Sequence, residues 1–132
     1  AGGGFKQTLV DSGIGDVIAN SITESAMNPL IAGWLVAVLI RLATGSATVA
    51  TVTASGIMVP LATGMGPTHL AMLVLAIGAG SVFFSHLNDA GFWLVKEYFG
   101  MTVGQTLKTW SLMETILSVT GLGCVMLLSL VL

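Results

Sequence analysis

The chain has 132 residues, of which 55% are hydrophobic and only 8% are charged, and its net charge is −2. About 25% of the residues in an ordinary soluble domain are charged, so this composition and the mean hydropathy of +0.97 predict a membrane protein. The lack of a basic excess excludes a nucleic-acid partner, and the single cysteine, Cys124, excludes both a disulfide framework and a cysteine-rich metal site.

Residues 1–28 are the most polar part of the chain. They contain one lysine, two aspartates and one glutamate within a modest amphipathic pattern. We expect a short re-entrant or interfacial segment here. The chain begins without an initiator Met and without a basic stretch before an apolar core, which is not the pattern of a signal peptide. We therefore expect it to be cut from a longer protein.

Residues 29–61 are expected to form an interrupted helix. Pro29 can open a helix at its first turn, and the next eleven residues are apolar or Gly up to Arg41. Eleven helical residues rise only about 16 Å, roughly half the hydrocarbon thickness of a bilayer. Either one long helix continues to about residue 59, or two half-helices meet at residues 45–46. The glycine and the buried arginine favour the break, because non-helical backbone survives at membrane depth where it lines a cavity.

A second interrupted helix is expected at residues 68–95. The 47 residues from Leu42 to Asn88 contain no Lys, Arg, Asp or Glu, which is more than one bilayer crossing needs. The polar stretch 86–91 interrupts the apolar pattern before it resumes at Phe92. Two discontinuous helices are a good sequence indication of a transporter binding site.

The C-terminal third is expected to contain a polar connector, residues 96–109, and the last transmembrane helix, residues 110–132. Trp110 is typical of an aromatic side chain at the membrane interface. Glu114 lies close to it in sequence, so an interfacial role is the default interpretation, and Glu114 is a weaker candidate for a role in transport than the acid at residue 89.

Hydroxyl side chains follow one helical face around the first break. Thr44, Thr48, Thr51 and Ser55 have i, i+4, i+7 and i+11 spacing. Such residues let membrane helices approach closely, and their hydroxyls can bond back to a carbonyl of the preceding turn. For the deeper members of the stripe, this packing role is as good an interpretation as substrate contact. Beside a glycine at a helix break, contact with a substrate is the better interpretation. The predicted substrate-binding residues are Gly45, Ser46, Thr48, Ser81 and Asn88.

Three charged or titratable residues could take part in transport. Arg41 could bind an anion or pair with Asp89, but its place at the end of an apolar run favours snorkelling to the interface. An acidic side chain at membrane depth costs free energy, so its presence there suggests a function. Asp89 is therefore the predicted carrier of the coupling proton. His86 is the predicted relay, because imidazole titrates near neutral pH. The alternative for this cluster is a polar cap at a membrane surface.

Four stretches resemble the gluconate permease family in order and spacing. They are residues 2–13, residues 41–50, residues 78–93 and residues 109–115. The resemblance covers the whole chain and matches the C-terminal part of that family. It implies a proton-coupled importer of gluconate or a related small hydroxy-acid, with D-serine or another small carboxylate as the alternative substrate.

The resemblance also implies an architecture. We expect an all-α integral membrane protein with interrupted transmembrane helices and a re-entrant hairpin, forming one half of an inverted-repeat transporter. Residues 1–132 would be the C-terminal part of a single transporter domain, multi-pass in the bacterial inner membrane, with the N-terminal half of the parent chain and a second copy as partners. No cofactor is expected beyond the proton, with sodium as the alternative coupling ion.

Two other classes of protein compete with a transporter. A non-transporting membrane subunit or anchor would tolerate alanine at residues 88 and 89. An enzyme is not expected, because the chain contains no zinc-ligand pair at helical spacing, no nucleophile elbow and no phosphate loop.

Overall fold

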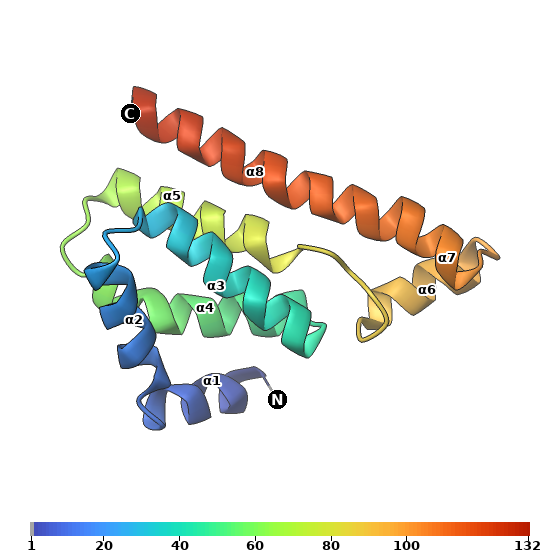
Figure 1. Ribbon diagram of the computed structural model, residues 1–132, viewed down its shortest axis with the longest axis horizontal. Coiled ribbons are helices and arrows are strands. Elements are labelled where there is room, and N and C mark those ends of the chain that lie inside the picture. The colour runs from blue at the N-terminus through green and yellow to red at the C-terminus, as the bar shows by residue number, and fades with distance from the viewer. Residues whose placement is uncertain (1) are drawn as a thin grey trace.

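The computed structural model describes residues 2–132, and within this range all regular structure is helical, which confirms the all-α class. The long C-terminal helix lies along one side of a compact group of shorter helices (Figure 1). The elements in chain order are α1 (Gly2–Asp11), α2 (Ile14–Glu24), α3 (Pro29–Thr44), α4 (Ala47–Ala62), α5 (Pro67–Ser81), α6 (Ala90–Tyr98), α7 (Val103–Thr106), the π-helical segment η1 (Leu107–Ser111) and α8 (Leu112–Val131).

The helices α3 and α4 form a hairpin with a two-residue connection, so the predicted break at residues 45–46 is present. Gly45 adopts the left-handed conformation, with φ of 69°, and ends α3, while the Ser46 hydroxyl accepts a hydrogen bond from Val49 N at 3.2 Å and begins α4. A hydroxyl at this position satisfies an N–H that the helix itself leaves unpaired. The two half-helices therefore run side by side instead of continuing in one line (Figure 1).

The core lies between α3, α4 and α5 and depends on small residues. Ala37, Ala50, Ala54 and Ala76 are completely buried. A Cβ added at Gly80 would collide with the backbone carbonyl of Trp34, so α3 and α5 approach each other closely at this point. Small residues at such interfaces are how membrane helices obtain close packing without a hydrophobic driving force.

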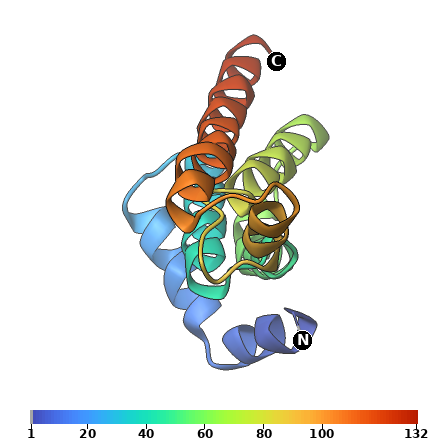
Figure 2. The same cartoon turned by 90° about the vertical axis from the view of Figure 1, so that its right-hand side faces the viewer.

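Within residues 2–132, one helix is long and apolar enough to cross a membrane. It is the continuous helical stretch Val103–Val131 of 29 residues, which rises about 43 Å. It packs on α5, with Gly121 against Ala79, and Trp34 Nε1 of α3 donates a hydrogen bond to Ser118 Oγ at 3.0 Å. Most of its apolar surface is exposed, and it lies on the opposite side of the molecule from α1 (Figure 2). The helices α3, α4 and α5 have only 15 or 16 residues, about 22–24 Å.

Three segment boundaries differ from those expected. Residues 1–28 contain two helices, α1 and α2, which both contact α4. The second break comprises residues 82–89, because α5 ends four residues before the polar stretch that starts at residue 86. Much of the expected connector 96–109 is helical and belongs to the long helix, which therefore begins before residue 110. The re-entrant hairpin, the inverted repeat and the single transporter domain stay predictions.

We expect Gly45→Ala to lower the unfolding temperature of the protein. A side chain there would require the left-handed conformation and would collide with the backbone of Asn88, and the conformational part alone costs about 1–2 kcal/mol. The measurement is thermal unfolding in detergent. Gly78→Ala is the matched control, since a Cβ at Gly78 meets nothing within 4 Å and alanine favours a helix interior. Equal unfolding temperatures for both variants would contradict this account of the first break.

Candidate functional site

The two helix breaks meet in space. The backbone of Gly45 lies directly against that of Asn88, with no room for a side chain between them. The Asn88 side-chain amide donates to the carbonyl of Leu42 at 2.9 Å, which joins the second break to the last turn of α3. Residues 43 positions apart in sequence thus become neighbours at one site.

A cleft of about 500 Å³ opens where the breaks meet. Its lining combines the end of α3, the beginnings of α4 and α6, and one face of the long C-terminal helix. We call it the polar cleft, and its lining residues are Arg41, Thr44, Gly45, Ser46, Ala47, Thr48, Val82, Asn88, Asp89, Ala90, Gly91, Trp110 and Glu114.

Arg41 is the centre of the polar cleft and is only 4% exposed. Its Nη1 donates to the Gly45 carbonyl at 2.7 Å, and its Nη2 donates to Asp89 Oδ2 at 2.6 Å. Its Nε is buried and has no hydrogen-bond partner among the described residues. The predicted snorkelling is therefore wrong: the side chain turns inward, because Asp89 and the Gly45 carbonyl at the end of α3 offer partners there.

Asp89 holds the second break in place. Its Oδ2 accepts from Arg41 and from the Ser85 hydroxyl, the latter at 2.5 Å, and its Oδ1 accepts from Gly91 N at 2.9 Å as the N-cap of α6. A carboxylate at a helix N-terminus is also favoured by the helix dipole. The side chain thus joins three elements through three donors.

The π-helical segment lies against the same break. Trp110 Nε1 donates to Ser85 Oγ at 3.1 Å, and the Ser111 hydroxyl donates to the Ser85 carbonyl. Ser85 is fully buried, and its own hydroxyl donates a hydrogen bond to Asp89 Oδ2. Residue 85 thus has tertiary hydrogen-bond partners, and Phe84 before it has a φ of 40°, outside helical geometry. A π-helical turn often accompanies a functional site.

Glu114 is the second acid of the polar cleft. It lies on α8, its side chain is 15% exposed, and its Oε2 is 3.5 Å from Arg41 Nη2. The long helix turns this residue toward Arg41, and its position relative to the membrane interface stays a prediction. Trp110, expected at the membrane interface, likewise lines the cleft.

The structure brings together most of the predicted site residues. Those that line the polar cleft are Gly45, Ser46, Thr48, Asn88 and Asp89. Ser81 and His86 are outside the lining. The hydroxyl of Ser81 donates to the Gly78 carbonyl at 2.7 Å, and the ring of His86 stacks at a tilt on Phe84, 5.5 Å between centroids. Two residues of the hydroxyl stripe bond back to their own helices, as the packing interpretation predicts: Thr44 to Ile40 O and Thr51 to Ala47 O.

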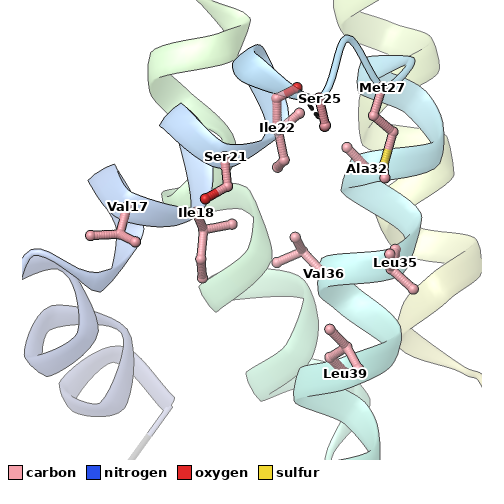
Figure 3. Close-up of a pocket in the computed structure, with 10 residues that line it drawn as sticks. All are labelled: Val17, Ile18, Ser21, Ile22, Ser25, Met27, Ala32, Leu35, Val36 and Leu39. Atoms are coloured by element: carbon pink, nitrogen blue, oxygen red, sulfur yellow. Dashed lines mark hydrogen bonds between the residues drawn. The ribbon is translucent and has the colours of Figure 1, made fainter.

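A second cavity, of about 350 Å³, lies between α2 and α3 (Figure 3). Its lining is aliphatic apart from two serines and Met27, and Ser25 already donates its hydroxyl to the Ile22 carbonyl. It offers neither a charged group nor a helix break to a polar substrate. The polar cleft is therefore the candidate site for transport.

Comparison with known proteins agrees with a transport site. The sequence profile described as "GntP family permease" matches residues 1–131. This chain belongs to the GntP permease family. It is 59% identical to a gluconate permease of Pseudomonas aeruginosa over 100% of this chain, and 54% identical to a high-affinity gluconate transporter of Escherichia coli K12 over 96% of it.

Another relative is named for a different substrate. The chain is 51% identical to the Gnt-II system L-idonate transporter of Escherichia coli over 99% of its length. The chain spans 29–30% of the length of these three relatives. No solved structure matches it. Family membership supports a membrane transporter rather than an enzyme, and the C-terminal position within a longer permease stays a prediction.

We expect Arg41→Ala to destabilise the protein strongly, because it leaves Asp89 and Glu114 without their shared cation. Removing one partner of a buried ion pair costs about 3–5 kcal/mol. Thermal unfolding in detergent measures the effect. Lys108→Ala, which removes an exposed cation from η1, should leave the unfolding temperature within about one degree of wild type. An Arg41→Ala protein as stable as this control would show that the ion pair is not what joins the breaks.

Proposed function

We propose that this chain contributes the substrate site of a secondary active transporter that takes up gluconate, or a related small hydroxy-acid, together with a proton across the inner membrane. The observation that carries the proposal is the polar cleft, where two helix breaks surround a buried arginine whose Nε has no partner among the described residues. Unwound backbone that lines a cavity at membrane depth is the usual form of a transporter binding site.

The geometry fits a substrate with one carboxylate and several hydroxyl groups. The N-termini of α4 and α6 both open on the cleft, at Ala47–Thr48 and at Ala90–Gly91. Helix N-termini attract anions, and Arg41 adds a full positive charge. Asn88 and the hydroxyls of Ser46 and Thr48 offer hydrogen bonds suited to a polyol chain.

The relatives support this class of substrate. These relatives are named as transporters of gluconate or L-idonate, which are both sugar acids. D-Serine or another small carboxylate is the alternative, because the same groups would bind it. In the complete transporter the chain would form the C-terminal part of a multi-pass protein, paired with the N-terminal half and assembled as a homo-oligomer.

Proton coupling in this proposal uses the acidic groups around Arg41. Asp89 is the residue predicted from sequence to carry the proton, with His86 as relay and sodium as the alternative ion. In the structure Asp89 is within the polar cleft, whereas His86 is outside its lining. The coupling role of either residue stays a proposal.

We expect Thr48→Ala in the complete transporter to raise the KM for gluconate several-fold. It removes one hydrogen bond, worth about 0.5–1.5 kcal/mol, and Thr48 is exposed to the cleft without capping a helix. Ser46→Ala is less informative because it also removes the N-cap of α4. Uptake of labelled gluconate by cells measures the change.

Ser55→Ala is the matched control for Thr48→Ala. Ser55 belongs to the same hydroxyl stripe and is exposed, but it is outside the polar cleft. The KM of the Ser55→Ala transporter for gluconate should equal that of wild type. Equal KM values for wild type, Thr48→Ala and Ser55→Ala would show that the hydroxyl stripe serves helix packing and not substrate binding. If a variant with alanine at both residue 88 and residue 89 keeps its transport activity, the result would favour the competing hypothesis that this chain is a non-transporting subunit or anchor.

A further inference from the structure

The polar cleft contains more negative than positive charge. Arg41 is the one cation that contacts Asp89 and Glu114 within residues 2–132. When both acids are ionised, the three side chains carry a net charge of −1 in a place where they are 4%, 17% and 15% exposed. An uncompensated charge is expensive to bury. A proton on one of the two acids would remove the excess.

The two acids differ in what they would lose on protonation. Asp89 accepts from Arg41, Ser85 and Gly91 N, at 2.5–2.9 Å. Glu114 has one contact with Arg41 at 3.5 Å, which is longer than a good N–H···O hydrogen bond. Protonating Asp89 would weaken three good bonds, whereas protonating Glu114 would cost one poor contact.

We infer that Glu114 takes up the coupling proton, while Asp89 keeps Arg41 in position. This inference rests on the proposed function, since it assigns the proton of that transport step to one residue. The elements packed around Glu114 bring no competing charge: α6 pairs its Lys96 with Glu97 at 2.7 Å. His69 of α5 lies near Ser129 and Leu130, at the opposite end of α8.

The assignment explains why proton and substrate would move together. With Glu114 ionised, a substrate carboxylate entering the cleft meets two carboxylates and one guanidinium. With Glu114 protonated, Arg41 Nη2 has one acidic partner, and its buried Nε is still unpartnered. The arriving carboxylate then restores the net charge of −1 that the proton removed. One proton with one monoanion moves no net charge across the membrane.

The deciding variant is Glu114→Gln, which imitates the protonated acid in shape and charge. In proteoliposomes that contain the complete transporter, it should exchange labelled gluconate across the membrane at equal pH. It should not concentrate gluconate when an inward proton gradient is imposed. Glu97→Gln is the matched control, because Glu97 is exposed, and it should concentrate gluconate like wild type.

A measurement on the wild-type protein keeps the inference testable if Glu114→Gln folds poorly. The dissociation constant of the wild-type protein for gluconate should rise with pH by up to about tenfold per pH unit, because binding is linked to one proton. A wild-type constant that does not change between pH 5 and 8 would overturn the inference.

The outcomes separate the inference from the proposed function. If wild type neither exchanges nor concentrates gluconate, the proposed function fails and the inference fails with it. If wild type does both and Glu114→Gln still concentrates gluconate to the wild-type ratio, only the inference fails. Loss of concentration in Asp89→Asn, with exchange retained and Glu114→Gln behaving like wild type, would assign the proton to Asp89.

Discussion

The structure depends on the placement of one guanidinium. Arg41 ends the apolar run of α3, yet it is almost completely buried and contacts the first break through the Gly45 carbonyl and the second through Asp89. A buried ion pair adds little net stability compared with apolar packing, but losing one partner is costly. Such a pair therefore selects one arrangement of the chain. Here that arrangement brings both breaks to the same point.

The breaks themselves survive because their polar backbone groups find partners. Asn28, Ser46 and Asp89 each cap a helix with a side-chain oxygen. Gly45 N bonds back to the Arg41 carbonyl at 2.9 Å, and residue 85 is held by Trp110 and Ser111. In a bilayer an unsatisfied group costs several kcal/mol, so each break needs such partners. The consequence for function is a polar cavity with fixed walls that come from separate elements.

The residues that line the polar cleft come from two parts of the chain, one tightly packed and one largely exposed. The helices α3, α4 and α5 form a tight bundle around small residues, whereas Glu114 comes from the long helix, whose outer surface is largely exposed. Arg41 contacts both parts. The Arg41–Glu114 contact therefore joins α3 of the bundle to the long helix.

The sequence by itself determined the membrane class, the helical content, the first break and five of the thirteen cleft residues, because composition, Gly and Pro positions and hydroxyl spacing are local properties. It also carried the family resemblance, which the comparisons confirm. Only the tertiary structure decided that Arg41 turns inward, that Ser85 and Trp110 support Asp89, and that Glu114 faces Arg41 across 73 positions of sequence. The direction of these side chains is set by which helices pack together, and no periodicity within a single helix records that choice.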